Sequence, residues 1–388
     1  MRLIHSSDLH IGMVFKGFDA EVAARLRDAR EGVVRILGEL AVRHGATTVL
    51  LAGDIYDKQL LKPQTLAKPI EAMRQFARIA WHLIPGNHDH ARDNGLWHRL
   101  RRLALPQNVH LHTDPGAVEI AEEGAGVFLL PAPLRYMDSD DDLTAYMDTA
   151  TTPIGAIRIG LAHGSVQGFG ADGEAKNYIA PDRAERAGLA YLALGDWHRQ
   201  MPISERTWYS GTAEPDQFKL PPGSSGTLCN GGGALLVDIA GARAKPIVTA
   251  VETGRYRWHQ VCENLSDDSQ IDVLEDRLRG LDPDLARVVL DLRVTGALSL
   301  AGRKRFAETI VESGIGAAVC AMRRDDAGLV AEPTQIDMDD IDRAGFVRTA
   351  VDSLVTMKSD FSNRERARLA SLALRRLYLE HLSDMATR

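Results

Sequence analysis

The stretch TTVLLAGD, residues 47–54, gives the clearest indication of the fold. It is a continuous apolar run that stops at Gly53 and Asp54, which is typical of a strand buried inside a sheet. Residues 19–44 before it carry apolar side chains at helical spacing, and a first strand-like run, MRLIHSSD, precedes that helix. A strand, a long helix and a second strand in this order predict an α/β layered sheet.

The same alternation continues through about the first 200 residues. A second helical pattern covers roughly residues 64–79 and leads to a third strand, WHLIPGNHD. Further strands are predicted at GVFLLPAP, AIRIGLAHG and LAYLALGD, each of which stops at glycine, proline or a polar residue. Functional groups gather where the strands of such sheets end. We therefore expect the site in the loops after these strands.

The pattern changes after the glycine-rich stretch PPGSSGTLCNGGG, residues 221–233. This stretch lacks the GxxxxGK[ST] pattern of a phosphate-binding loop, and we interpret it as a turn. From about residue 250 the predicted order is a compact βαβαβ unit, and the last fifty residues or so are helical, with Asn363 as an N-cap. The expected parts are a main α/β domain over 1–245, a small α+β domain over 246–335 and a helical segment over 336–388.

Composition narrows the class of protein. The chain has 388 residues, with 46 Lys and Arg against 53 Asp and Glu and a net charge of −7, which excludes a generally basic nucleic-acid-coating protein but allows a local basic groove. Its 3 cysteines form no CxxC pair. The N-terminus does not resemble a signal peptide, and no apolar run reaches the roughly 20 residues of a membrane span. These features predict a soluble cytoplasmic protein without membrane contact.

Five fragments with carboxylate, imidazole or amide side chains lie at the ends of predicted strands. Each fragment alone is weak evidence of a functional site, because a single histidine after a strand is more often structural and Asn-His-Asp also suits a turn. Five such fragments in order along the chain indicate one functional site. The fragments contain Asp8 and His10, then Asp54 and Asp57, then Asn87, His88 and Asp89, then His163, and finally Asp196 and His198.

This mixture of donors is typical of a metal centre. Carboxylate, imidazole and amide oxygen suit Mn, Fe, Mg or a Zn-containing pair, and argue against Cu(I) or an iron–sulfur cluster. Two ions about 3.5–4 Å apart need a bridging carboxylate. Asp54, central in the set, is the natural bridge.

The motifs HSSDLHIG, LLAGDIYD, IPGNHD, LAHG and LGDWHR resemble, in order, the five motifs of the calcineurin-like metallophosphoesterases. The opening motif and the later segment WYSGTAEPDQF are similar to the SbcD-type DNA repair nucleases. The resemblance covers roughly residues 1–220. It implies a four-layer sandwich of two mixed β-sheets flanked by helices, followed by a small capping domain and a helical tail.

The resemblance also implies roles for these residues. Two divalent metal ions are expected, with Mn favoured and Mg, Fe or Zn as alternatives. Asp57 is either an outer support or a structural cap, while His88 is expected to face the scissile phosphate and Asp89 to orient His88. The implied ligands are Asp8, His10, Asp54 and His198 for the first ion, and Asp54, Asn87, His163 and Asp196 for the second.

Residue 196 departs from the family pattern. Where the family has Gly-His-x-His, this chain has Gly-Asp-Trp-His at residues 195–198. In an extended chain Asp196 and His198 project to the same side, and Trp197 faces away as a packed wall. A carboxylate is a harder donor than an imidazole and favours Mn or Mg over Zn. The alternative is that Asp196 misses the metal.

Two basic segments have two interpretations each. HARDNGLWHRLRRL, residues 90–103, either lines a nucleic-acid path beside the metals or forms a solvated helix face. The same alternatives apply to Arg303, Lys304 and Arg305.

The resemblance implies a two-metal phosphodiesterase that cleaves DNA as an exo- or endonuclease in DNA repair. The implied partners are DNA and an SbcC-like coiled-coil ATPase that docks on the helical tail, and a homodimer is allowed. One alternative is a metallophosphoesterase of small-molecule or nucleotide phosphoesters, because the same metals would serve. A scaffold that lost its ions is the least favoured, because the ligand positions are intact in residue type.

Overall fold

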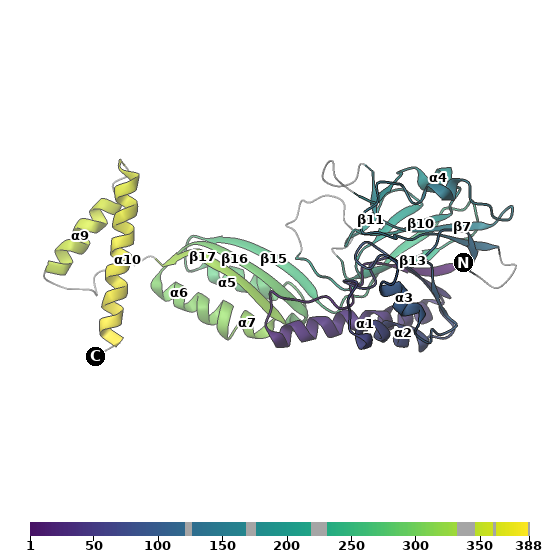
Figure 1. Cartoon of the computed structure of the whole chain (residues 1–388). Coiled ribbons are helices and arrows are strands. Elements are labelled where there is room, and N and C mark those ends of the chain that lie inside the picture. The colour runs from purple at the N-terminus through teal and green to yellow at the C-terminus, as the bar shows by residue number, and fades with distance from the viewer. Residues whose placement is uncertain (121–125, 168–175, 219–230, 332–345, 360–361, 387–388) are drawn as a thin grey trace. The chain divides into compact units, whose positions relative to one another are not determined.

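The structure is a computed structural model that describes residues 1–120, 126–167, 176–218, 231–331, 346–359 and 362–386 (Figure 1). The chain divides into two units, Met1–Trp258 and His259–Arg388. The expected boundary at 245/246 is too early, because strand β14 (Ile247–Glu252) pairs along its length with β13 (Gly233–Asp238) in a sheet of the first unit.

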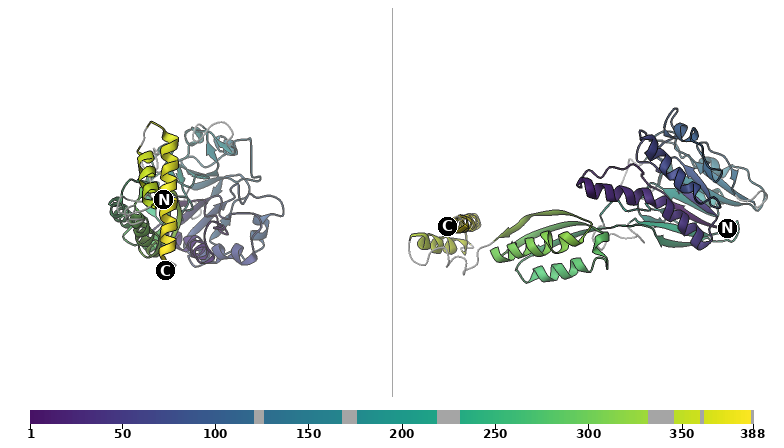
Figure 2. Two further views of the ribbon diagram at one scale, coloured as in Figure 1. Left: turned by 90° about the vertical axis from the view of Figure 1, so that its left-hand side faces the viewer. Right: turned by 90° about the horizontal axis from the view of Figure 1, so that it is seen from below.

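The first sheet of the first unit is six-stranded, in the order β14-β13-β1-β2-β3-β4. Strands β1 to β4 are parallel, whereas β13 pairs antiparallel with β1 and β14. Helices α1, α2 and α3 cover one face of this sheet (Figures 1 and 2). The elements are β1 (Arg2–Ser6), α1 (Ala20–His44), β2 (Thr48–Ala52), α2 (Pro63–Arg74), β3 (Ala80–Ile84), α3 (Leu96–Arg101) and β4 (Val109–Leu111).

The second sheet is also six-stranded, in the order β11-β12-β10-β7-β6-β5. Its four central strands are parallel, and β5 and β11 are antiparallel at the edges. The short helices η1 and α4 pack on its outer face. The elements are β5 (Val118–Glu119), β6 (Val127–Ala132), η1 (Ala145–Asp148), β7 (Ile157–His163), α4 (Arg183–Arg186), β10 (Tyr191–Gly195), β11 (Gln200–Pro202) and β12 (Thr207–Ser210), with a separate pair of β8 (Ser165–Val166) and β9 (Tyr178–Ile179).

A core between the two sheets holds the sandwich together. Leu50 of the first sheet and Leu161 of the second are fully buried in this layer. Leu51, the next residue on β2, points instead to the helical layer, because successive side chains of a strand face opposite sides. The continuous apolar runs of the sequence are therefore strands buried on both faces. The predicted fold, two mixed sheets flanked by helices, is confirmed.

The second unit contains a three-stranded sheet with helices on one face (Figure 2). Its strands and helices follow the predicted βαβαβ order, and β16 and β17 are parallel. In the C-terminal segment α9 and α10 pack through Val351 and Leu374, and Asn363 accepts a 3.1 Å bond from the Arg366 amide as an N-cap. The elements are β15 (Arg257–Leu265), α5 (Gln270–Arg279), η2 (Leu285–Arg287), β16 (Val288–Leu298), α6 (Leu300–Phe306), η3 (Ala307–Glu312), α7 (Ile315–Ala318), β17 (Ala321–Ala331), α9 (Phe346–Lys358) and α10 (Arg364–Ala386).

Candidate metal centre

The predicted site residues meet at the carboxyl ends of parallel strands. Asp8 and His10 follow β1, Asp54 follows β2, and the loop of Asn87 follows β3 in the first sheet. His163 ends β7, and residues 196–198 follow β10 in the second sheet. The two sheets thus each contribute one edge to the site.

The backbone around the ligands is held in an unusual conformation. Asp8 (φ 53°), His10 (φ 43°), Asp54 (φ 51°) and Asp196 (φ 107°) all have positive φ, which is strained for residues other than glycine. Backbone bonds join the first two loops, since the Asp8 amide donates to the Gly53 carbonyl (3.1 Å) and the His10 amide to the Asp54 carbonyl (2.9 Å). Such strain persists only where neighbouring structure fixes it, and it concentrates at functional sites.

One group of possible ligands consists of Asp8, His10 and His198, whose donor atoms lie within 4.8 Å of one another. The Nε2 atoms of His10 and His198 face each other at 3.2 Å. The Nδ1 atom of His10 is buried and makes no hydrogen bond with any described residue. The facing Nε2 atoms of His10 and His198 suit a cation bound between them.

A second group consists of Asp8, Asp54 and His163. The Oδ2 atom of Asp54 lies 3.5 Å from His163 Nε2 and 3.7 Å from His10 Nε2, so this carboxylate stands between histidines of both groups. The Oδ1 atom of Asn87 is 2.9 Å from His163 Nε2. Asp54 therefore lies between the two groups, Asp8 belongs to both, and the bridging role of Asp54 stays a prediction.

The electrostatics of the site favour bound cations. The residues Asp8 and Asp54 are only 0% and 2% exposed, and burial raises the pKa of Asp8. Burial by itself would lower the pKa of His163, but the carboxylates of Asp54 and Asp8 outweigh it and raise this pKa to about 9. Buried carboxylates are costly unless positive charge compensates them. The donor set therefore fits divalent metal ions.

Asp216 contacts the ring nitrogen of His198 that does not face His10, and the sequence-based prediction gave it no role. Its Oδ2 atom is 2.8 Å from His198 Nδ1 and 3.4 Å from the buried guanidinium of Arg30. Burial alone would lower the pKa of His198, but the Asp216 hydrogen bond raises it to about 9. A carboxylate on the far nitrogen of a ligating histidine fixes its ring and tautomer. In the sequence, the sign of this role was the place of Asp216 in the segment WYSGTAEPDQF, residues 208–218.

Glycines in the motifs leave room for the ligands. A Cβ atom on Gly86 would lie 2.2 Å from Asp54 Oδ1, and one on Gly53 would lie 2.3 Å from His163 Nδ1. Gly53 also has a φ of +88°. The glycines before Asp54 and Asn87 are thus required by the close approach of ligand side chains.

His88 lies at the exposed mouth of the site. Its amide donates to Asp54 Oδ1 (2.9 Å), and its ring packs edge-to-face on His10 with centroids 4.7 Å apart. Its Nδ1 atom pairs with the Asp57 carbonyl (3.0 Å). The side chains of His10, Asp57 and His88 form a third group of possible donors. His88 is therefore next to the metal ligands and open to solvent.

Asp89 does not orient the His88 ring as we expected. Its carboxylate accepts from the amides of Gly86 (2.7 Å) and Tyr56 (3.1 Å), and the Asp57 carbonyl orients His88 instead. Burial and the nearby Asp54 raise the pKa of Asp89 to about 8. Asp89 thus ties the loop after β3 to the loop after β2.

Asp196 lies beside the second group without joining it. Its Oδ1 atom is 3.9 Å from His163 Nε2, and its Oδ2 atom accepts from Ser165 Oγ (2.7 Å). None of the three donor groups found in the described part of the chain includes it. Trp197 packs near Tyr209 on the outer side of the second sheet, as the alternation predicted. Ligation by Asp196 stays a prediction.

Comparison with known proteins finds a family that the first part of the chain resembles. Residues 1–169 match the family model of the calcineurin-like phosphoesterases. This part of the chain is similar to that family. The similarity agrees with a donor set that fits divalent metals.

Two curated proteins are similar to part of this chain. The uncharacterized metallophosphoesterase YhaO of Bacillus subtilis is 28% identical over 218 residues, covering 53% of this chain and 50% of YhaO. The DNA double-strand break repair protein Mre11 of Archaeoglobus fulgidus is 28% identical over 120 residues, covering 30% of this chain and 26% of that protein. The chain thus spans half or less of the length of these relatives.

Two solved structures match part of the chain at low TM-scores. TT1561 of Thermus thermophilus has a TM-score of 0.40 at 11% identity, covering 65% of this chain and 98% of that one. GAP50 of Plasmodium, the anchor in the inner membrane complex, has a TM-score of 0.38 at 9% identity, covering 65% of this chain and 88% of that one. In the described part of our chain, no helix has the length and apolar character needed to cross a membrane.

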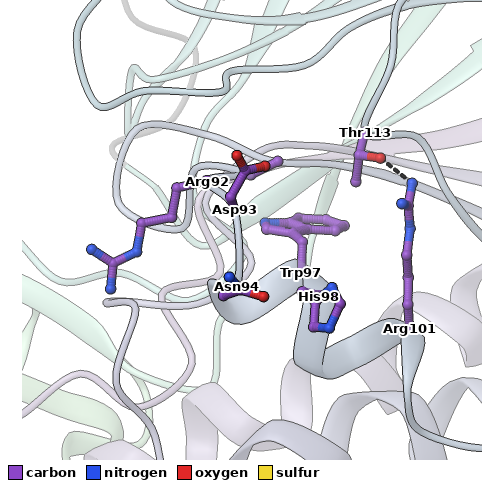
Figure 3. Close-up of a pocket in the computed structure, with 8 residues that line it drawn as sticks. Arg92, Asp93, Asn94, Trp97, His98, Arg101 and Thr113 are labelled. Carbon is purple, nitrogen blue, oxygen red and sulfur yellow. Dashed lines mark hydrogen bonds between the residues drawn. The ribbon is translucent and has the colours of Figure 1, made fainter.

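A polar cavity of about 320 Å³ lies beside the His88 loop of the first unit (Figure 3). Arg101 lines it and reaches Thr113, while Arg99 is held by the Gln59 and Leu61 carbonyls. The cavity lining consists of Ala91, Arg92, Asp93, Asn94, Trp97, His98, Arg101 and Thr113.

The basic residues of the second unit have acidic neighbours, as Arg101 of this cavity has Asp114 at 3.7 Å. Arg303 pairs with Asp326, Lys304 with Glu308 and Arg305 with Asp272. Those pairs favour a solvated helix face for the second basic segment.

Proposed function

We propose that the first unit is a metal-dependent DNA nuclease, the nuclease subunit of an SbcCD-like repair complex in the cytoplasm. The observation that carries the proposal is the cavity with Arg92, His98 and Arg101 directly after the exposed His88. Cationic side chains beside a phosphodiesterase centre suit a polyanionic substrate. The local similarity to an archaeal Mre11 supports the same substrate.

The ligands would divide between two ions. Asp8, His10, Asp54 and His198 would hold one, and Asp54, Asn87, His163 and Asp196 the other. When bound, such a pair of divalent ions polarises the phosphoryl group and lowers the pKa of water. Hard oxygen donors mixed with imidazole make Mn the favoured metal.

The chain itself contributes the groups around the phosphate. At the mouth of the site, the exposed His88 can use Nε2 to donate a hydrogen bond to the phosphoryl oxygens or a proton to the leaving oxygen. The carbonyl of Asp57 holds the opposite nitrogen and so fixes which edge faces outward. Asp216 and Ala52 do the same for His198 and His163 through their Nδ1 atoms.

The C-terminal helices are the proposed docking segment for an SbcC-like coiled-coil ATPase. Leu369 and Leu372 of α10 are 56% and 50% exposed. Exposed leucines close together on one helix are typical of a surface that a partner covers. A homodimer of this chain is compatible with the same proposal.

The test compares substrates and variants of the full chain loaded with Mn²⁺. Single- and double-stranded DNA are assayed beside bis(p-nitrophenyl) phosphate and p-nitrophenyl phosphate. We expect DNA cleavage by the wild type, and a loss of at least about 100-fold in Asp54→Asn and His88→Ala. The matched control is His44→Ala, at the far end of α1, which should cleave like the wild type.

The outcomes separate the alternatives. Hydrolysis of the small esters without DNA cleavage would show a small-molecule phosphoesterase. A protein that takes up no Mn²⁺ and cleaves nothing would be a scaffold. Either result overturns the nuclease proposal.

A further inference from the structure

A second cavity, of about 360 Å³, opens after β6 and differs in chemistry from the cationic one. Its walls include Pro133, Leu143 and the rings of Tyr136 and Tyr146. The Tyr146 hydroxyl donates to the Pro131 carbonyl (2.7 Å), so this ring is fixed. Tyr136 is 71% exposed at the rim. The volume is at the lower end of the range of small-molecule sites, about 300–1,000 Å³.

Backbone bonds attach this aromatic cavity to the catalytic loop. The Ala91 amide donates to the Leu134 carbonyl (2.8 Å), and the Leu134 amide donates to the Pro85 carbonyl (3.5 Å). Pro85 and Ala91 flank the loop that carries Asn87 and His88. Leu134 itself sits between two residues that line the aromatic cavity, Pro133 and Arg135.

A small neighbouring cavity connects the same place to the metal ligands. It shares Ala132, Asp141 and Leu143 with the aromatic cavity, and His163 forms part of its wall. The aromatic cavity is therefore on the side of the site where the second metal ligand group lies.

One carboxylate joins the aromatic cavity to the cationic cavity. Asp114 lies 2.5 Å from the guanidinium of Arg135 and 3.7 Å from that of Arg101. Arg135 lines the aromatic cavity and Arg101 lines the cationic one. A cationic site and an aromatic site thus lie next to each other beside His88.

We infer that the aromatic cavity binds one unstacked nucleobase of the DNA strand, with the neighbouring phosphates near Arg101; this rests on the proposed nuclease function. Base stacking on aromatic side chains next to a positive path is how proteins hold single strands. The cavity itself suits a phosphate poorly, because Asp141 and Asp142 are part of its lining and its arginine, Arg135, is paired with Asp114. Asp142 is already held by Arg183 (2.8 Å), which leaves Asp141 to accept from an exocyclic amino group.

The inference names a substrate class. A base inside a duplex is stacked and paired, so it cannot enter the cavity without being unpaired. The preferred substrates are single strands, overhangs and frayed ends with a free nucleotide near the scissile bond.

The test measures equilibrium binding of a fluorescent single-stranded oligonucleotide to the full chain with Ca²⁺ in place of Mn²⁺. Tyr136→Ala is expected to weaken binding about tenfold, and Tyr136→Phe to bind like the wild type, because stacking needs only the ring. Met137→Ala, a neighbouring exposed residue outside the cavity, is the matched control and should bind and cleave normally. In a second measurement, a single abasic site is placed at successive positions along the oligonucleotide. The wild type should lose affinity when the abasic site is at one particular position, whereas Tyr136→Ala should lose affinity at none.

The results distinguish this inference from the function it rests on. If the wild type cleaves DNA but Tyr136→Ala binds every strand as tightly as the wild type, the nucleobase cavity is wrong and the nuclease stands. If the wild type neither binds nor cleaves DNA, both are wrong. Loss of binding in Tyr136→Ala, its rescue in Tyr136→Phe and a single sensitive abasic position establish the cavity.

Discussion

Gly86 is a residue where the site tolerates little change. A methyl group there would meet the Asp54 carboxylate and the Asp54 amide, at 2.2 and 2.5 Å. We predict that Gly86→Ala displaces Asp54 and lowers Mn²⁺ affinity at least about tenfold, measured by isothermal titration calorimetry. Gly241→Ala, where the added methyl meets nothing within 4 Å, is the control and should bind Mn²⁺ normally. Equal affinities in the two variants would contradict the close approach.

A substitution of Asp216 tests whether a residue that holds a metal ligand in place contributes to metal affinity. Asp216→Asn keeps the shape but removes the charge that holds the His198 ring and faces Arg30. We predict a loss of about 10–100-fold in metal affinity. Metal content after dialysis and circular dichroism would show whether the loss is specific. An unfolded variant, or one with unchanged affinity, would contradict the proposed role.

Asp196 sets the choice of metal if it is a ligand. We predict that Asp196→His keeps metal binding and shifts the preference from Mn²⁺ toward Zn²⁺, because imidazole is a softer donor. Competition between the two ions, read by mass spectrometry of the bound metal, measures the shift. If Asp196→Ala leaves metal content and activity unchanged, Asp196 is no ligand.

The polar residues that meet at the site could be located from the sequence because they follow strands. Parallel neighbours end at a common edge, so polar residues after buried runs come together wherever those runs pair. Arg30 and Asp216 had no such signal. Arg30 lies inside α1 and reaches the Leu9 and Glu214 carbonyls only in the folded chain. The role of Asp89 was misjudged for the same reason, since its partners are backbone amides of two loops.

Among the elements, the edge formed by β3 and β4 carries a cluster of three histidines, His82, His110 and His112. Their rings stack, with His82 at 4.7 Å from His110 and 5.2 Å from His112, and His82 Nδ1 lies 3.0 Å from His112 Nε2. Burial and the neighbouring rings lower the pKa of His82 and bring that of His112 to about 4. The cluster is neutral in the folded state.

Acid should therefore loosen this edge. The unfolded histidines take up protons below their ordinary pKa of 6.5, whereas the folded ones do not, so stability is unaffected above pH 6.5 and falls as the pH drops from 6.5 toward 4. The loss is about 1.4 kcal/mol per pH unit for each neutral buried histidine. Urea unfolding at pH 7.5, 6 and 5 measures it. His110→Phe, which keeps a ring beside His82, should depend less steeply on pH; an equal slope would contradict the cluster as its source.

Long apolar runs and periodic helices were predictable as elements, whereas short edge strands were not. β5 and β11 have only 2 and 3 residues, too few for a pattern. The local pattern places β13 after the glycine-rich stretch, where the predicted organisation of the chain changes. β13 pairs instead with Arg2–His5 at the other end of the domain. Pairing between strands so far apart in the sequence leaves no local sequence pattern from which to predict it.

At the scale of the whole molecule, the boundary of the first unit can be tested by truncation. Trp258 packs with Phe15, Phe18 and Phe218, at ring-centroid distances of 6.2, 5.6 and 4.9 Å. We predict that residues 1–258 fold and bind Mn²⁺, whereas residues 1–245 are destabilised by at least about 3 kcal/mol, because they lose β14 and this buried tryptophan. Thermal melts followed by circular dichroism compare the two. Equal melting temperatures would place the boundary at 245 after all.

The ligands come from positions between Asp8 and His198 on two different sheets, and this separation makes the metal a thermodynamic reporter of the sandwich. No short segment of the unfolded chain carries the full donor set, so the ions bind the native state almost exclusively. Free metal at about 100 times its dissociation constant should then add about 2.7 kcal/mol to the unfolding free energy. The melting temperature would rise with the logarithm of metal concentration and fall on addition of a chelator. Assembly of the two sheets could thus be followed without any substrate.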